Sequence, residues 1–318
     1  MTLPSGLAGS AMMVEVRGLA RSFGERIAVA GLDFMVARGE LFGLVGPDGA
    51  GKTTTLRMLA GVLKPSAGDA LLAGRSVVAE PEAVKPHLAY MSQRFGLYAD
   101  LTVAENLDFY ADLYRVPKTE RAATLERLYE FSNLGPFKDR LAGALSGGMK
   151  QKLGLSCALI HQPEILLLDE PTFGVDPISR RELWRIVHER VESGMTAIVS
   201  TSYLDEAERF DRLALLDQGR LLATGTPAEL AASLEGVLFE VAVAEPRAAA
   251  AKIEAIQGVE AALLFGERLH VLVGSETAAG FPAALGGLGL GAAAARIEPG
   301  LEDVFLLRFA PAARAVAA

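Results

Sequence analysis

One eight-residue stretch, GPDGAGKT from Gly46 to Thr53, limits what this chain can fold into more than any other feature of its sequence. The apolar run ELFGLVG that leads into it predicts a buried strand, and TTTLRML, which follows, predicts a helix. Glycines at such a strand-to-helix turn let backbone N–H groups close around a phosphate, and the helix N-terminus adds positive potential. In this context the pattern G-x-x-x-x-G-K-T predicts a phosphate-binding loop in an α/β fold.

Individual side chains of the loop have expected roles toward a bound nucleotide. Lys52 would reach the β- and γ-phosphates, and Thr53 would hold Mg²⁺. Asp48 adds a negative charge, which must point away from the phosphates or be offset by Lys52 and Mg²⁺. The predicted nucleotide-binding residues of this region are Gly46, Pro47, Asp48, Gly49, Ala50, Gly51, Lys52, Thr53 and Thr54.

A second motif, EILLLDEPT, places two carboxylates at the end of another apolar run. Asp169 emerges at the end of the predicted strand, where it can hold the magnesium shell. Glu170 follows and can polarise a water for attack on the γ-phosphate. Read alone, the motif could also be a solvated acidic turn. Together with the phosphate loop it predicts an Mg-nucleotide hydrolase.

Short apolar runs alternate with longer amphipathic segments through much of the chain. The runs ELFGLVG, HLAYMSQ, EILLLDE, TAIVSTS and RLALLDQG predict buried strands, and LLDQGRLLATG predicts a hairpin. A helix is predicted to start after Pro177 and to stop at Gly194. Buried strands alternating with helices indicate an α/β fold with a largely parallel sheet. Residues 94–160 carry apolar residues at helical spacing instead, which predicts a helical subdomain inserted into this body.

After GTPAEL the composition shifts to alanine and glycine, and we predict a separate small domain over 231–318. Its pattern predicts strand, helix, two strands, helix and strand, as in a split βαβ layer. The predicted elements are 236–244, 247–257, 261–266, 268–273, 276–288 and 292–297, with LEDVFLLRF as a closing helix. At the other end, MTLPSGLAGSAMM lacks the basic start and apolar centre of a signal peptide, and residues 1–12 are expected to be a frayed tail.

The segment LSGGMKQKLGLSCALI holds a second candidate anion site. Ser146 is a good helix N-cap, and Gly147 and Gly148 leave backbone amides open to an anion. A single nucleotide site would not be expected to use a second phosphate-binding helix start. The second helix start is explained if it contacts the nucleotide site of a second copy. These residues resemble LSGGQ, the signature of the ATP-binding cassette (ABC) family, with Met149 where Gln is usual.

The resemblance spans about Val14 to Leu230 and implies further roles. Gln93 resembles the Q-loop glutamine, which touches Mg²⁺ and the surroundings of the attacking water. Asp176, in FGVDP, resembles the D-loop aspartate that crosses to the partner cassette. Phe23 sits where the family stacks an aromatic ring on adenine, although a plain core phenylalanine is the alternative. The implied fold is a P-loop NTPase core over 13–230, with an antiparallel β subdomain, the inserted helical subdomain and a small α+β C-terminal domain.

The resemblance also implies a setting for the chain. RFGLYADLTVAENLDFYADLY and EPGLEDVFLLRF resemble the ATPases of bacterial ABC exporters of drugs or other hydrophobic cargo. Such a subunit takes ATP and Mg²⁺, pairs with a second cassette as homodimer or heterodimer, and seats a coupling helix of an integral membrane subunit on its aromatic helical segment. It would lie peripherally on the cytoplasmic face of the bacterial inner membrane.

Composition bears on which partners, disulfides and membrane spans can be expected for the chain. The formal charge of -8 does not suggest a nucleic-acid partner, and the single cysteine, Cys157, rules out a disulfide within the chain. Thr277–Ala295 is uncharged but built of Ala and Gly, so a spanning helix is not expected. A soluble ABC protein acting on ribosomes or DNA would usually show tandem cassettes, basic linkers or a coiled-coil insertion. A regulatory module that binds nucleotide without turnover stays open.

The strand tip TAIVSTS raises the main question about activity. In the ABC family this tip normally ends in a histidine that contacts the γ-phosphate, and here Ser202 holds the aligned position. None of the four histidines can be aligned there: His87, His161, His188 and His270. A serine can donate one hydrogen bond but cannot carry charge, so we expect slowed hydrolysis with ATP binding kept. Three outcomes are compatible with a serine at this position. The chain could hydrolyse ATP slowly through Glu170, it could pair with a second, complete cassette, or a tethered water could occupy the gap.

Overall fold

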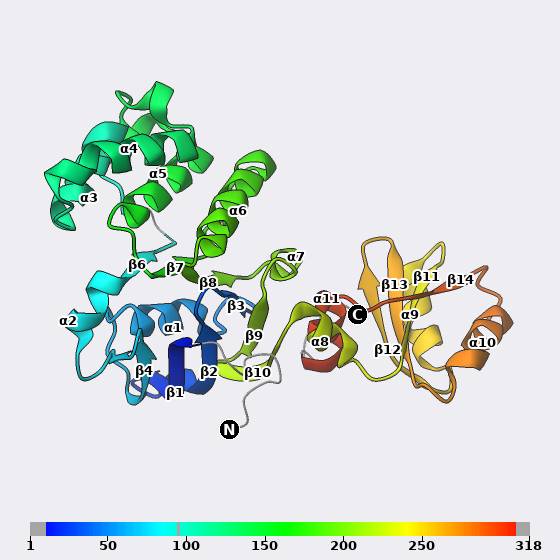
Figure 1. Ribbon diagram of the computed structural model, residues 1–318. Coiled ribbons are helices and arrows are strands. Elements are labelled where there is room, and N and C mark those ends of the chain that lie inside the picture. The colour runs from blue at the N-terminus through cyan, green and yellow to red at the C-terminus, as the bar shows by residue number, and fades with distance from the viewer. Residues whose placement is uncertain (1–10, 94–95, 310–318) are drawn as a thin grey trace. The chain divides into compact units, whose positions relative to one another are not determined.

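The computed structural model describes residues 11–93 and 96–309, which fold as two compact units divided between Thr224 and Gly225 (Figure 1). The predicted tail over 1–10 and the first two residues of the predicted helical subdomain lie outside the described residues. Met12, which we placed in the tail, is instead the first residue of a strand. It pairs with Ala37 in the neighbouring strand, which extends the first sheet to this point.

An antiparallel sheet forms one layer of the first unit, as predicted. Its strand order is β2-β1-β4-β5, and the strands are β1 (Met12–Phe23), β2 (Arg26–Ala37), β4 (Ala67–Leu72) and β5 (Arg75–Ser76). Alternate residues of β1, such as Val14 and Val16, face the core. Gly24 makes the turn between β1 and β2 with φ +58°, a conformation that favours glycine.

The second layer is the central sheet, with strand order β10-β9-β3-β8-β7-β6. Its strands are β3 (Leu41–Val45), β6 (Leu88–Met91), β7 (Ile165–Asp169), β8 (Thr196–Thr201), β9 (Arg212–Asp217) and β10 (Arg220–Gly225). The strands from β9 to β6 pair in parallel, which confirms the five predicted strands and the α/β class. Every residue of β3, β7 and β8 is buried, because helices and the first sheet cover both faces.

Helices on opposite sides of the central sheet fix its position. Helix α1 (Lys52–Leu59) lies between the two sheets, in a core that includes Phe34, Leu56 and Leu167 (Figure 1). The other side carries α3 (Val103–Leu113), α4 (Lys118–Ser132), α5 (Gly147–Leu159) and α6 (Pro177–Glu192). The predicted helical subdomain thus contains α3, α4 and α5. Gly194, with φ +99°, follows α6 where its stop was predicted.

Short elements complete the first unit. They are α2 (Pro81–Val84), α7 (Leu204–Ala207) and the 3₁₀ turns η1 (Lys85–His87), η2 (Gly135–Phe137) and η3 (Ala142–Ala144). Cys157 is buried on α5, and burial raises the pKa of its thiol, which agrees with a small core residue.

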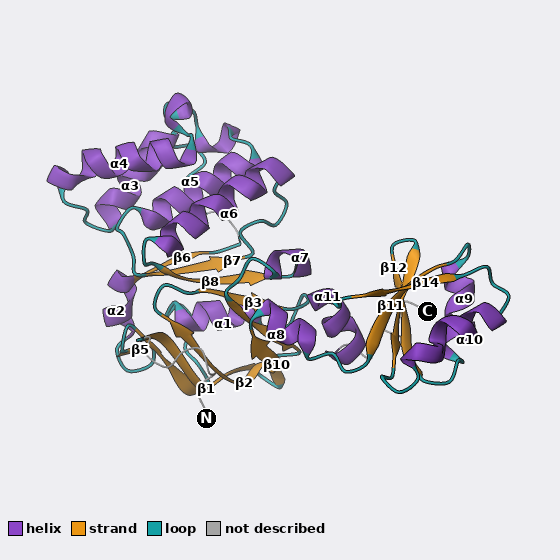
Figure 2. Cartoon of the chain, turned by 45° about the vertical axis from the view of Figure 1, so that its right-hand side comes forward, coloured by secondary structure: helices purple, strands orange, loops and turns teal. Residues whose placement is uncertain are grey.

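The second unit is the split βαβ layer that the sequence predicts (Figure 2). Its sheet has the order β12-β13-β11-β14 with all pairs antiparallel. The strands are β11 (Val237–Ala242), β12 (Val259–Phe265), β13 (Arg268–Val273) and β14 (Ala293–Ile297). The helices are α8 (Pro227–Ala232), α9 (Pro246–Glu254), α10 (Phe281–Gly287), preceded by η4 (Ala278–Gly280), and α11 (Leu301–Val304).

The first four predicted elements of this unit and its last strand agree with the structure to within three residues, and three larger differences remain. Helix α10 begins at Phe281, later than predicted, because Pro282 lacks an N–H and suits only a first helical turn. The closing helix changes from α11 to a π-helix, η5 (Phe305–Phe309). Helix α8 contacts α11 and belongs to this unit, so the unit starts at Gly225, before the predicted boundary at residue 230. Among the described residues, no helix has the length and apolarity needed to cross a membrane.

Candidate functional site

The residues of the two predicted phosphate and magnesium motifs gather at the carboxyl edge of the central sheet. The phosphate loop follows β3, Glu170 follows β7 and Ser202 follows β8, and these three strands are neighbours. Two loop glycines leave no room for a side chain. A Cβ on Gly46 would lie 2.1 Å from the Leu216 carbonyl oxygen, and one on Gly51, where φ is +99°, would lie 2.6 Å from that of Ala28. The loop therefore packs closely against the β2 and β9 backbones.

Lys52 is the buried cation of the site. Its ammonium donates to the carbonyl oxygens of Gly46 at 2.7 Å and Pro47 at 3.1 Å, and to Ser202 Oγ at 2.9 Å. It also lies 3.2 Å from Glu170 Oε1. The side chain is only 4% exposed, so this carboxylate and these oxygens replace water around the charge.

Asp169 forms the second half of the site, and three side chains donate to its carboxylate. Thr53 Oγ1 and Ser200 Oγ donate to Oδ1 at 2.9 and 2.8 Å, and Tyr90 donates to Oδ2 at 3.2 Å. Burial raises the pKa of Tyr90 to about 12, with a further contribution from the Asp169 charge, so the phenol stays a neutral donor. Ser200 and Tyr90 were not among the predicted site residues.

Glu170 has an unusual backbone. Its φ of +48° lies in the left-handed region, which is strained for residues other than glycine and typically costs about 1–3 kcal/mol. Its N–H is held by Ser200, 3.0 Å from Oγ and 3.1 Å from the carbonyl oxygen. Gln93 Nε2 donates to Oε2 at 3.2 Å, and Ser202 Oγ donates to Oε1 at 2.8 Å. Three parts of the chain therefore fix this carboxylate: the phosphate loop through Lys52, the segment of Gln93, and the end of β8 through Ser202.

Ser202 stands between the charges of the site. Its hydroxyl accepts from Lys52, donates to Glu170, and lies 3.3 Å from Asp48 Oδ1. Asp48 therefore faces Ser202 and the cavity beside it. The hydroxyls that end TAIVSTS have separate partners, because Ser200 serves Asp169 while Thr201 donates to the buried Glu206 at 2.8 Å.

A cavity of about 830 Å³ opens beside these groups. Phe23 lines it and is 48% exposed, with the Arg21 guanidinium 4.6 Å from the ring centroid, so the alternative of a core phenylalanine is wrong. Lining residues that sequence reasoning missed come from β2 and from the β9–β10 turn: Arg26, Ile27, Ala28 and Gln218. The predicted residues that line it are Phe23, Asp48, Gly49, Ala50, Gly51, Lys52, Thr53, Thr54, Gln93 and Glu170.

The signature residues form a separate group that does not line this cavity. Ser146 caps α5 by accepting from Met149 N at 3.3 Å, as predicted. Gly147 and Gly148 begin that helix, and a Cβ on Gly148 would lie 2.1 Å from Ser179 Oγ. Asp176 caps α6, and hydrogen bonds from Ser179 lower the pKa of its carboxyl. The helix starts of α5 and α6 thus lie against each other.

Comparison with known proteins places the chain in a family. Residues 29–173 match the ABC transporter family. The chain is 53% identical over 229 residues, 71% of its length, to the Probable multidrug ABC transporter ATP-binding protein YbhF of Escherichia coli (strain K12), of which the match covers 40%. It is 39% identical to the Daunorubicin/doxorubicin resistance ATP-binding protein DrrA of Streptomyces peucetius, over 70% of this chain and 67% of that one.

A further relative and a solved structure agree. The Nod factor export ATP-binding protein I of Ralstonia nicotianae (strain ATCC BAA-1114 / GMI1000) is 40% identical, over 70% of both chains. The structure of an ATP binding subunit of an ABC transporter superposes with a TM-score of 0.63 at 30% identity, over 69% of this chain and 91% of that one. The fold and site define a P-loop nucleotide-binding domain. The chain belongs to the ABC transporter family, as one of its ATP-binding cassettes.

Proposed function

We propose that this chain binds and hydrolyses ATP and thereby energises a membrane exporter of drug-like or other hydrophobic cargo. The main support for this proposal is the position of Ser202, which joins Lys52 and Glu170 by hydrogen bonds where both line the large cavity. The Thr53–Asp169 pair lies beside them. The names of the multidrug and drug-resistance relatives support the export role.

The residues present fit ATP with Mg²⁺. Thr53 and Asp169 offer hydroxyl and carboxylate oxygens 2.9 Å apart, the kind of ligand this ion prefers. Gln93 contributes an amide oxygen, because its Nε2 is the atom that donates to Glu170. When bound, the ion would neutralise charge on the phosphates. Lys52 is the protein cation that would meet the same phosphates.

Glu170 is the proposed general base. Its carboxylate would accept the proton of the attacking water, while Gln93 and Ser202 hold its two oxygens in place. Ser202 holds Glu170 by a hydrogen bond alone, because a hydroxyl cannot carry the positive charge that an imidazole can. We therefore propose a working but slowed ATPase. A positioned charged group is worth about 10²–10⁴ in rate, which bounds the loss.

The signature group supports a partnership between two cassettes. Ser146 and Asp176 stand outside the chain's own cavity, so we propose that they act on the site of a second cassette, identical or different. Exposed aromatic residues of the helical subdomain, among them Tyr98 and Phe109, would receive a coupling helix of an integral membrane subunit. The chain would then lie peripherally on the cytoplasmic face of the bacterial inner membrane.

Steady-state ATPase measurements on Glu170→Gln test the hydrolytic role. This change keeps the size of the side chain but removes the base, so we expect turnover to fall about 10²–10⁴-fold with ATP binding kept. Glu192→Gln, at an exposed position at the end of α6, is the matched control and should keep full activity. Equal turnover in the native chain and Glu170→Gln would refute the role. Failure to co-purify with any membrane protein from the native host would refute the exporter role.

A further inference from the structure

A second cavity lies at the opposite edge of the central sheet, where β7 and β8 begin. Its volume is about 270 Å³, and its walls come from α4, from the end of α5 with the loop before β7, and from the connection between α6 and β8. Because parallel strands start at one edge and end at the other, this cavity is separate from the nucleotide site at the carboxyl edge. None of its lining residues belongs to the nucleotide cavity.

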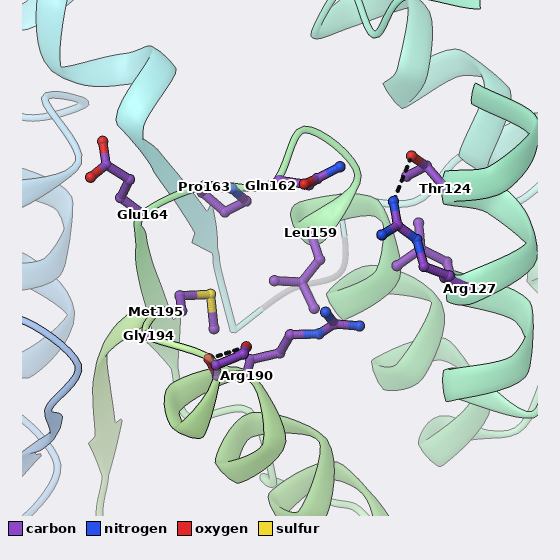
Figure 3. A pocket seen from close by; sticks show the side chains of 11 residues that line it. Thr124, Arg127, Leu159, Gln162, Pro163, Glu164, Arg190, Gly194 and Met195 are labelled. Carbon is purple, nitrogen blue, oxygen red and sulfur yellow. Dashed lines mark hydrogen bonds between the residues drawn. The ribbon is translucent and has the colours of Figure 1, made fainter. Parts of the chain in front are cut away.

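Two arginines reach into this cavity from different helices. Figure 3 shows Arg127 of α4 and Arg190 of α6 extending into the space beside Leu159, with the Arg127 guanidinium turned toward Thr124. The only hydrogen bond of the Arg127 guanidinium among the described residues goes to Thr124 Oγ1, at 3.3 Å. Arg190 Nε is buried without a hydrogen-bond partner there, and the guanidinium stacks 4.7 Å from the Phe131 ring centroid.

Nearby carboxylates are engaged elsewhere. Glu164 lines the cavity, but its oxygens bind Arg38 at 2.9 Å and His87 at 2.8 Å, and Figure 3 shows the carboxylate turned away from both arginines. Glu189 pairs with Arg185 at 2.6 Å. In the described part of the chain, neither Arg127 nor Arg190 forms an ion pair.

This arrangement has an electrostatic cost. Burial lowers the pKa of Arg190, and the charge of Arg127 lowers it further, while Glu189 only partly opposes the shift. Arg127 is exposed and Arg190 is half-buried. Two like charges that line one cavity repel each other, and an anion between them would replace repulsion with two attractive contacts. The planar guanidinium fork matches the oxygens of a phosphate or a carboxylate.

We propose that this cavity binds a small oxyanion with two negative charges, such as a phosphate or a dicarboxylate, between Arg127 and Arg190. Thr124, only 4% exposed, would donate its hydroxyl proton, because its oxygen already accepts from Arg127. Leu159 and Met195 give the cavity an apolar wall that would receive a short carbon skeleton. A ligand held this way would tie α4 of the helical subdomain to the end of α6.

Isothermal titration calorimetry with inorganic phosphate tests the site directly. The chain is first saturated with Mg²⁺ and a non-hydrolysable ATP analogue, so that the phosphate loop is filled, and ionic strength is held constant. We expect saturable binding to the native chain and at least tenfold weaker binding to Arg127→Gln and to Arg190→Gln, since each change removes one charged contact. Succinate in place of phosphate distinguishes a dicarboxylate from a phosphate ligand.

Two controls keep the result decisive. Arg181→Gln removes an exposed arginine from the same helix and should bind like the native chain. Because Arg190 also packs on Phe131, the thermal midpoint of each variant is measured, and Arg127→Gln carries the test if Arg190→Gln is destabilised. Absence of saturable binding by both phosphate and succinate would overturn the proposal. So would binding that neither substitution weakens.

Discussion

The central sheet carries a buried glutamate at each edge, and the two are surrounded differently. Glu40, just before β3 at the amino edge, accepts from the Ala37 N–H at 2.6 Å and from Arg212 at 3.1 Å. Glu170, just after β7 at the carboxyl edge, meets Lys52, Ser202 and Gln93 and lines the nucleotide cavity. They are 6% and 9% exposed, so burial alone does not separate them.

The two glutamates differ in the role of the basic side chain that contacts each of them. Arg212 compensates Glu40, whose pKa burial raises while the Ala37 N–H and Arg212 hold it down. Lys52 contacts a carbonyl oxygen of its own loop, Ser202 and Glu170 at the same time. It also lines the cavity that a phosphate would enter. A buried ion pair is therefore a poor sign of function by itself. The left-handed backbone of Glu170 and the adjoining cavity are the better signs.

The largest effect is expected from Arg212→Met, which breaks the amino-edge pair. It leaves the Glu40 charge buried without its partner, so the free energy of unfolding should fall by about 3–5 kcal/mol. Folded Glu40 would take up a proton more readily than unfolded Glu40, so the loss should be greatest near neutral pH and shrink as pH falls. Urea unfolding at several pH values measures this. Arg209→Met, at an exposed position, is the control, and an equal loss there would contradict the assignment.

Lys52→Met is the matching change at the carboxyl edge, and its effect should appear in binding instead. Hydrogen bonds to charged groups contribute about 1.5–3 kcal/mol, so the affinity for ATP should fall roughly 10- to 150-fold. Stability should change little, because Glu170 keeps Ser202 and Gln93 and borders the cavity. Titration with a fluorescent ATP analogue and urea unfolding together test the contrast. A large stability loss with unchanged affinity would reverse the two roles.

The smallest effect is expected from Ser200→Ala, which removes one donor to Asp169. Thr53 and Tyr90 still hold that carboxylate, and the Glu170 N–H keeps the Ser200 carbonyl. We expect a loss of about 1 kcal/mol in stability and turnover lowered several-fold. Ser193→Ala, which removes an exposed hydroxyl bonded to the Arg190 carbonyl, is the control. Full activity in Ser200→Ala would show that Asp169 does not need this partner.

The sequence predicted those site residues that lie within short, recognisable motifs. GPDGAGKT and EILLLDEPT place Lys52, Thr53, Asp169 and Glu170 at strand ends, because strand, turn and residue type coincide within a few positions. Tyr90 and Ser200 were missed because their partner Asp169 is distant in sequence, and a tyrosine or serine within an apolar run carries no local sign of that partner. The Glu40–Arg212 pair joins residues 172 positions apart and left no local signal.

Element order was predictable in the second unit, while element ends were not. Alanine-rich runs are compatible with more than one hydrophobic period, so the predicted start of α10 was too early. Nothing in LEDVFLLRF distinguishes a π-helix from an α-helix. The cavity between Arg127 and Arg190 was also beyond sequence reasoning. Its walls combine three segments that come together only in the folded chain.

We propose that the carboxyl edge is a working hydrolytic site in which Ser202 positions Glu170. The most direct test is steady-state ATPase activity of the purified chain beside Ser202→His and Ser202→Ala. We predict measurable native turnover, a lower rate in Ser202→Ala, which loses the 2.8 Å hydrogen bond to Glu170, and a higher rate in Ser202→His. No turnover in the native chain, with activity appearing only in Ser202→His, would contradict the claim and show a cassette that is silent without a complete partner.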